Sequence, residues 1–115
     1  MAIVVATPPV TPSNVLVYAT DFRLSPSRDS APSGRLRVQL KNNGQDDHDI
    51  AVKRRAAGAL PLAASPVVRP HGLTQFTVVL PPGRYVFFCT VADHAARGMQ
   101  RGFTVLPRRR ASRGA

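Results

Sequence analysis

The sequence predicts an all-β protein, an antiparallel Greek-key β-sandwich built as a single domain. The chain has 115 residues, the length of one domain, and 43% of them are apolar, which is enough for one core. Eleven prolines and eight glycines divide the chain into short segments with turn signals between them. The stretch 35–41 alternates polar and apolar residues, which is the pattern of a strand with one buried face.

The sequence predicts three parts of the chain with different structure. Residues 1–13 contain three prolines and predict an extended lead-in or the remnant of a tether. Residues 14–106 are expected to form the folded domain, and residues 107–115 a flexible basic tail. The N-terminus lacks the basic region and long apolar core of a signal peptide, so we expect any export signal or anchor to have been removed. Apolar stretches are too short for a membrane-spanning helix, which predicts a soluble chain.

Strands are predicted where β-branched and aromatic residues run between turn signals, at 15–24, 35–41, 48–52, 75–80, 84–89 and 101–106. The alternation in 35–41 should bury Leu36, Val38 and Leu40 on one sheet face. Residues 53–73 contain too many prolines for regular structure, and we expect an irregular excursion with at most a short helical turn at 56–59.

One predicted hairpin places the only cysteine of the chain at the end of a sheet. Residues 75–80 form its first strand, Pro81–Gly83 supply a tight turn, and 84–89 return as the second strand. Cys89 is therefore expected at a strand end, directly before the loop 90–100. A single cysteine cannot form an intramolecular disulfide, so Cys89 must be inert, reactive or a metal ligand.

The formal charge of +10 predicts attraction to anionic partners. It arises from fourteen arginines and two lysines set against six aspartates. Nucleic-acid recognition would need basic residues interleaved with exposed aromatics, and the C-terminal RRRASR segment has no aromatic residue. We therefore expect no specific nucleic-acid partner.

The loop after the predicted hairpin carries three kinds of copper ligand at equal spacing. Cys89, His94 and Met99 lie five residues apart and offer a thiolate, an imidazole and a thioether. A trigonal site of two histidines and one cysteine, with a weak axial methionine, suits copper in both oxidation states. His48, where a turn meets a strand, supplies the second histidine, because a sandwich brings a strand end beside the loop that follows another strand. His71 lies in a turn without a partner and is expected at the surface.

Other interpretations of these residues stay open. A lone cysteine at a strand end is ordinarily a small buried hydrophobe, Met99 is open to a role in core packing, and His48 to one in capping a loop. A Cys–His nucleophile pair would need a third group to orient the base, and the sequence shows none, so no enzyme activity is expected. Zinc also accepts cysteine and histidine, but Met99 would then have no role.

At these residues the chain resembles the cupredoxins, over about Val15 to Leu106. The similar features are the Asp21-Phe22 segment, the turn at 42–44 ahead of His48, the Pro-Gly-Arg-Tyr hairpin at 82–85 and the Phe-Phe-Cys approach to the loop. Four residues separate Cys from His and His from Met, as in rusticyanin, auracyanin and sulfocyanin loops. The chain differs from many members in having Ala92-Asp93 before the second histidine and Asp49 after the first.

The resemblance implies a fold, a cofactor and a function. The cofactor would be one copper ion in a type 1 (blue) site held by His48, Cys89, His94 and Met99, with electrons passing through the exposed edge of His94. The function would be outer-sphere electron transfer; copper delivery or storage, and a domain excised from a larger oxidase, are the alternatives. The additional carboxylates near the metal favour Cu(II) and a lower potential.

The charge and the resemblance together suggest the partners and the location. We expect redox proteins with an acidic docking surface, since Arg97 and Arg101 lie near the ligand loop, or an anionic membrane surface met by the basic tail. The chain is expected to be a monomer outside the cytoplasm, in the periplasm or on the outer face of a membrane.

Overall fold

The computed structural model describes residues 12–108, which form nine strands and no helix. The strands are β1 (Ser13–Thr20), β2 (Arg23–Pro26), β3 (Ser30–Pro32), β4 (Gly34–Asn42), β5 (Ala51–Arg54), β6 (Pro61–Ala64), β7 (Leu73–Leu80), β8 (Gly83–Phe88) and β9 (Gln100–Leu106). No helix able to cross a membrane occurs in the described range. The predicted lead-in at 1–13 and the predicted tail at 107–115 lie mostly outside the described residues.

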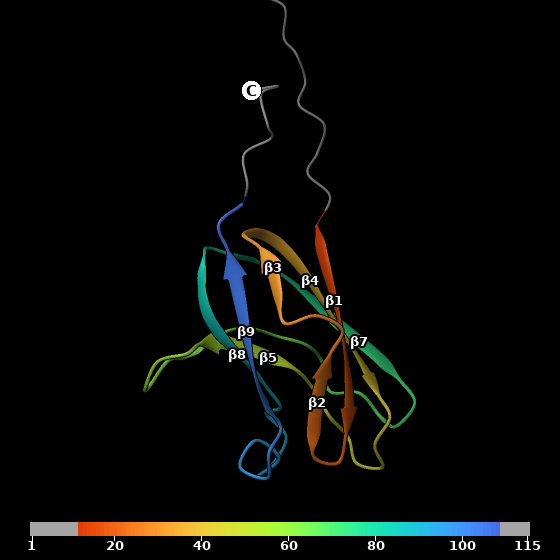
Figure 1. Cartoon of the computed structure of the whole chain (residues 1–115). Helices are drawn as coiled ribbons and strands as arrows, with labels where there is room; N and C mark the ends of the chain where they lie inside the picture. The colour runs from red at the N-terminus through yellow and green to blue at the C-terminus, as the bar shows by residue number, and fades with distance from the viewer. Residues whose placement is uncertain (1–11, 109–115) are drawn as a thin grey trace, which may run out of the picture.

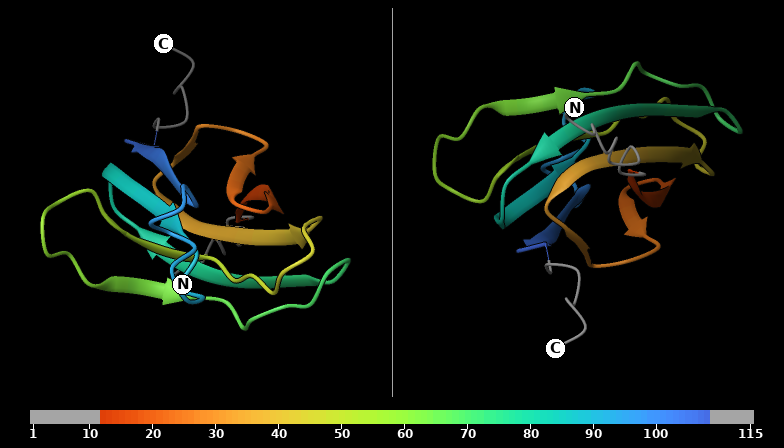
Figure 2. Two further views of the ribbon diagram at one scale, coloured as in Figure 1. Left: turned by 90° about the horizontal axis from the view of Figure 1, so that it is seen from below. Right: turned by 90° about the horizontal axis from the view of Figure 1, so that it is seen from above.

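The strands form two sheets that pack face to face (Figure 2), which confirms the predicted β-sandwich. One sheet has the order β2-β1-β4-β7 and the other the order β3-β9-β8-β5-β6. Two of the seven strand pairings are parallel, β1 with β4 and β3 with β9, so the sheets are mixed rather than wholly antiparallel. After β2 the chain crosses to the other sheet and forms β3. It then returns to the first sheet as β4, which runs parallel to β1.

Three details of the predicted strand pattern were wrong. The strand predicted at 15–24 is divided by a turn at Asp21-Phe22, and the loop at 25–34 contains the short edge strand β3. The region 53–73, expected to be irregular, contains β6, while the short turn expected at 56–59 is present, with the N–H of Ala59 donating to the carbonyl of Ala56 at 3.1 Å. Pro61 begins β6 at the edge of its sheet, where the missing N–H of proline has no ladder partner to lose.

The core lies between the two sheets as one cluster of buried apolar side chains. Leu36, Val38 and Leu40 are buried along β4, as the alternation predicts. Facing strands contribute Phe87 and Phe103, whose ring centroids are 4.8 Å apart. This core fixes the strand ends, and through them it fixes the loops.

Three loops meet at one end of the sandwich, opposite to the end where β1 begins and β9 ends (Figure 1). They are the β1–β2 turn at 20–23, the β4–β5 connection at 42–50 and the β8–β9 connection at 89–99. We call this the loop end. Each of the sequence-predicted ligands lies in the second or third of these loops.

Candidate metal centre

Three candidate donor atoms converge at the loop end. The side-chain ligand atoms of His48, Cys89 and His94 all lie within 4.8 Å of one another, and all three residues are buried. The sulfur of Cys89 is 3.9 Å from Nδ1 of His48 and 3.6 Å from Nδ1 of His94. Both imidazoles therefore present Nδ1 to the sulfur, although His48 precedes Cys89 by 41 residues and His94 follows it by five.

The spacing of these donors fits a small metal ion between them. An ion bound by sulfur at about 2.3 Å and by nitrogen at about 2.0 Å, in trigonal geometry, separates those donors by roughly 3.7 Å. The two sulfur–nitrogen distances in this chain bracket that value. A set of two imidazoles and one thiolate suits copper and also zinc, and a fourth thioether ligand favours copper.

Met99 closes the same loop but is positioned here through its backbone. Its N–H donates to the carbonyl of His94 at 3.1 Å, and its carbonyl accepts from the N–H of Cys89 at 3.2 Å. Its side chain is fully buried. These bonds place the predicted axial ligand directly beside the two loop ligands, as the equal spacing suggests.

Asp49 joins the loop of the first histidine to the cysteine strand. Its carboxylate accepts from the backbone N–H of Thr90 at 2.6 Å and from the Thr90 hydroxyl. Asp49 is 3% exposed, so these bonds are shielded from water and hold the two loops in register. Asp49, which differs from the residue found in many cupredoxins, therefore connects the neighbours of two candidate ligands, His48 and Cys89.

His48 is held on both sides. Its backbone N–H and C=O pair with Val68, at 3.1 and 2.8 Å. Its ring Nε2 lies 2.7 Å from Oδ1 of Asp21, across 27 residues of sequence. That contact fixes the ring so that Nδ1 is free to bind a metal, the arrangement common around metal-bound histidines. Asp21 also accepts from the backbone N–H groups of Gln45 and Asp46.

Gly44 makes the contact between Asp21 and His48 possible. A Cβ at this position would collide with the Asp21 carboxylate and lie 2.9 Å from Nε2 of His48. The backbone N–H of Gly44 donates to the side chain of Asn42, which in turn donates to the carbonyls of Asp46 and Val68. A buried asparagine thus shapes the loop from inside, and a glycine leaves the room for the carboxylate.

His94 packs under an aromatic ring and an exposed carboxylate. The ring of Phe22 lies 4.8 Å from the His94 ring, and Oδ2 of Asp46 is 3.5 Å from Nε2. Arg97 stacks on the outer side of Phe22 and pairs with Asp93 at 2.9 Å. His94 is 5% exposed whereas His48 is 0% exposed, so His94 is the ligand histidine nearer to solvent.

Burial raises the pKa of the Cys89 thiol, although backbone hydrogen bonds from Asp49 and Val91 act in the opposite direction. A neutral buried thiol is a weak nucleophile. A bound cation would be needed to stabilise the thiolate in this position. The environment of Cys89 therefore favours a metal ligand over the nucleophile of a Cys–His pair.

Sequence reasoning named the donors and missed the residues that support them. Asp21 and Phe22 were assigned to a strand, and Asp46 to an ordinary turn, yet all three contact a candidate ligand. The sequence signals at Asp21 and Phe22 were a β-rich context and the resemblance of this pair to a cupredoxin segment, and neither signal assigned them a role at the site. Arg97 lies beside the site as expected, while Arg101 faces Asp29 at 3.7 Å. His71 is exposed, as predicted.

Comparison with known proteins identifies the fold. No family model and no curated protein sequence matches this chain. Among solved structures, dithionite-reduced auracyanin from Roseiflexus castenholzii aligns with a TM-score of 0.69 and 24% identity, over 85% of this chain and 100% of that one. Auracyanin B aligns with a TM-score of 0.69 and 19% identity, over 87% and 94%. Auracyanin A from Chloroflexus aurantiacus, described as a blue copper protein, aligns at 0.67 and 15%, over 84% and 100%. The sandwich is thus the cupredoxin fold expected from the sequence.

Proposed function

We propose that this chain binds one copper ion in a type 1 site and carries single electrons between redox proteins by outer-sphere transfer. The observation that carries the proposal is the convergence of the His48, Cys89 and His94 donors in a buried position at the loop end. The backbone bonds of Met99 to two of these residues support it as the fourth ligand. Auracyanins with the same fold add support, since one is described as a blue copper protein.

The residues around the site would keep its geometry fixed while the charge of the ion changes. Copper, when bound, supplies the one-electron couple between Cu(II) and Cu(I). Asp21 holds the His48 ring, and Asp49 ties the cysteine strand to the His48 loop. Because these supports are independent of the metal, little rearrangement should accompany electron transfer. We propose exchange through the edge of His94, the more exposed of the two histidines.

The proposal also includes the oligomeric state, the location and the partners of the protein. We infer a monomeric domain at 14–106, located outside the cytoplasm, without enzymatic activity. Its partners would be redox proteins with an acidic docking surface, which the net charge of +10 supports. An anionic membrane surface is the second candidate, through the arginines of the C-terminal segment.

Reconstitution with Cu(II) tests the proposal. We expect one ion per chain, an intense visible band from thiolate-to-copper charge transfer, and the narrow copper hyperfine splitting of a type 1 site in electron paramagnetic resonance. Cys89→Ser should abolish the band and His48→Gln should alter both spectra. His71→Asn is the matched control, because His71 is exposed and has φ of 70°, which asparagine tolerates. A full visible band in Cys89→Ser would contradict the assignment.

Copper delivery is separated from electron transfer by the rate of metal loss. An electron carrier should retain copper through repeated oxidation and reduction in the presence of a Cu(I) chelator. A delivery protein should release Cu(I) to that chelator within a few cycles. The buried donors of this chain favour retention.

A further inference from the structure

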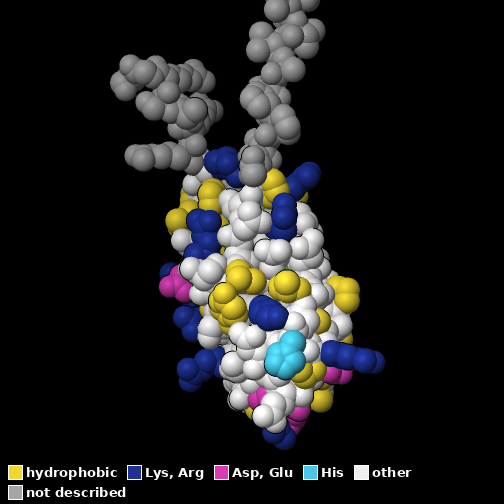
Figure 3. All heavy atoms as spheres, turned by 90° about the vertical axis from the view of Figure 1, so that its right-hand side faces the viewer, with side chains coloured by type: hydrophobic (Ala, Val, Ile, Leu, Met, Phe, Trp, Pro, Cys, Tyr) yellow, Lys and Arg dark blue, Asp and Glu magenta, His cyan; other side chains and the backbone are white. Residues whose placement is uncertain are grey.

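The negative charges of this basic protein are gathered at the loop end. Five of the six aspartates lie in its three loops: Asp21, Asp46, Asp47, Asp49 and Asp93. In the view of Figure 3, most of the visible acidic side chains lie in the lower part of the molecule, whereas Lys and Arg form separate patches from the top to the bottom of the face. The same loops contain Arg23 and Arg97, so their formal charge is −3, although the chain as a whole is at +10.

The two arginines expected near the electron port are already engaged with carboxylates. Arg97 pairs with Asp93 at 2.9 Å, and Arg101 is 3.7 Å from Asp29. The half-exposed carboxylate of Asp46 also lies 3.5 Å from Nε2 of His94. An acidic partner would therefore meet carboxylates at the loop end, and like-charge contacts oppose docking there.

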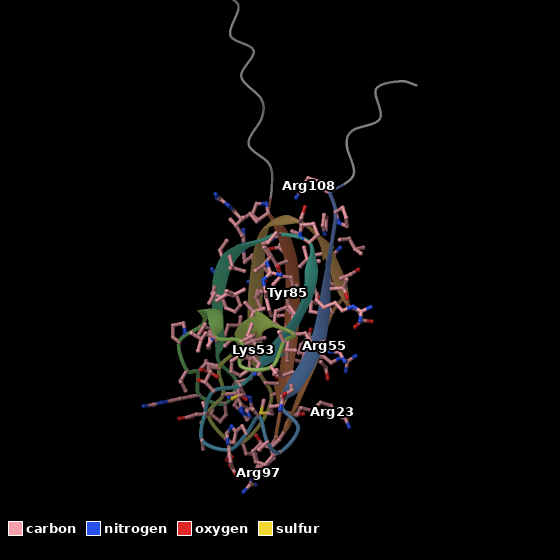
Figure 4. The ribbon with its side chains drawn as sticks, turned by 90° about the vertical axis from the view of Figure 1, so that its left-hand side faces the viewer. Arg23, Lys53, Arg55, Tyr85, Arg97 and Arg108 are labelled. Carbon is pink, nitrogen blue, oxygen red and sulfur yellow. The ribbon has the colours of Figure 1, made fainter. Side chains whose placement is uncertain are left out.

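A second surface carries cations that have no carboxylate partner. Lys53 and Arg54 end β5, Arg55 follows them, and Arg84 lies beside them on β8. None of the four is within salt-bridge distance of a carboxylate in the described part of the chain. We call these four residues the basic flank. Figure 4 looks onto this side, with Lys53 and Arg55 near the middle of the face and Arg97 at the loop end.

The basic flank is hollowed and its cations are partly held in place. Two shallow grooves meet at Arg55. One is lined also by Lys53, Arg54 and Val86, and the other by Arg84, Gly102, Thr104 and one carboxylate, that of Asp29, which lies 3.7 Å from Arg101. The Lys53 ammonium lies 4.6 Å over the Phe88 ring, and the Arg54 guanidinium 5.3 Å over the Tyr85 ring. The backbone N–H of Arg55 donates to the carbonyl of Arg84 at 2.9 Å. Cations held in this way lose less freedom when an anionic partner binds.

We propose that the basic flank is the docking surface for an acidic segment of a protein partner. The claim deepens the proposed function, on which it rests for the nature of the partner as a redox protein. β8 and β9 both line the two grooves, and β8 leads directly into Cys89, so a docked partner would stand beside the strand that precedes the sulfur ligand. The loop end would then serve electron exchange without providing the main charge attraction.

The shape of the surface favours a protein segment over a membrane. A bilayer offers a broad, nearly flat layer of charge, whereas these cations line grooves with Gly102 in the floor of one. A Cβ at Gly102 would meet nothing within 4 Å, so the floor is open to an incoming chain. Side chains of an extended acidic segment fit such a groove and lipid headgroups anchored in a bilayer do not.

The test is a titration of the isotopically labelled full chain with an octaglutamate peptide, followed by amide chemical shifts. We expect shifts confined to 53–57, 84–86 and 100–104, and roughly tenfold weaker binding when Lys53, Arg55 and Arg84 are all changed to Gln. The control changes Arg35, Arg37 and Arg69 to Gln. It removes the same charge elsewhere, and Arg35 and Arg37 lie on β4 of the other sheet. We expect less than a twofold change in this control.

Three outcomes would overturn the proposal: shifts centred on 43–48 and 92–98, equal weakening by both triple variants, or binding of anionic phospholipid vesicles at the basic flank without binding of the peptide. Thermal melts of both variants check that they remain folded. The titration is run with and without copper. A chain that fails to form a type 1 site yet shows the expected map refutes the proposed function alone, and the converse result refutes the docking surface alone.

Discussion

Replacing Asp21 with Asn should raise the reduction potential of the copper-loaded protein. The carboxylate lies against the Nε2 edge of His48, on the side of the ring opposite to the candidate metal-binding nitrogen. A negative charge in this position stabilises Cu(II) more than Cu(I), and it also makes the imidazole a stronger donor. Asparagine has nearly the same size and keeps one oxygen as an acceptor, so the change removes the charge and little else.

The structure gives the expected size of the effect. The carboxylate oxygen is 2.7 Å from Nε2. Adding the imidazole ring and a metal–nitrogen bond of about 2 Å places the charge about 6.5 Å from an ion at Nδ1. The interaction energy of two unit charges at that separation corresponds to a shift in potential of roughly 30 mV at the dielectric constant of water. At an effective dielectric constant of 20 the shift is roughly 110 mV. The Asp21 side chain is 25% exposed, and solvent screening leaves an expected rise of about 50 mV.

Cyclic voltammetry of the copper-loaded wild type and variant measures the shift directly. Asp29→Asn is the matched control, because Asp29 is 83% exposed and pairs with Arg101, away from the candidate ligands. It should move the potential by less than about 10 mV, since an exposed distant charge is screened by salt. A potential that is unchanged or lower in Asp21→Asn would refute the argued role of this carboxylate.

Three further predictions concern the axial ligand, acid stability and the core. Met99→Leu should retain copper and colour while raising the potential in voltammetry, because loss of a thioether destabilises Cu(II) more than Cu(I); a falling potential would exclude the axial role. The Gln45 amide is the main cause of a lowered pKa at Asp21. This carboxylate therefore stabilises the fold above its unfolded pKa of about 3.9 and loses that effect as the pH falls through its folded value, so pH-dependent melts of the metal-free chain should lose part of their acid dependence in Asp21→Asn. Phe87→Ala should cost about 3–5 kcal/mol in denaturant unfolding, against less than about 0.5 kcal/mol for the exposed control Leu73→Ala.

Strands were predictable from the sequence where burial alone determines the pattern. The alternation at 35–41 was decisive because β4 lies inside its sheet with one face on the core. The edge strands β3 and β6 carry no such pattern, since β3 has only three residues and β6 is largely exposed. The extended form of β3 depends on pairing with β9, which is distant in sequence, and that of β6 on pairing with the preceding strand β5 across an irregular connection. Pairing partners of that kind are tertiary information that no local window contains.

The candidate ligands were predictable for a different reason. Scarce residue types at equal spacing after a strand limit the chemistry before any fold is known, and the loop that carries Cys89, His94 and Met99 is local. The supporting residues are not local. Asp21 reaches His48 from another loop, and the contact also requires a glycine at position 44. No spacing rule connects these positions, because the sandwich alone brings the loops together.

Net charge was the least informative of the sequence signals about the site. It is a property of the whole chain, while a docking partner responds to the charges within about one screening length, ~8 Å at physiological salt. Folding gathers five aspartates in three loops at one end and leaves Lys53, Arg55 and Arg84 without carboxylate partners on the side of a sheet. The same chain therefore offers a negative field around the candidate electron port and a positive one beside it. This asymmetry would orient a partner with one acidic patch before contact. The basic flank attracts the acidic patch and the loop end repels it, so both effects turn the partner toward the same orientation.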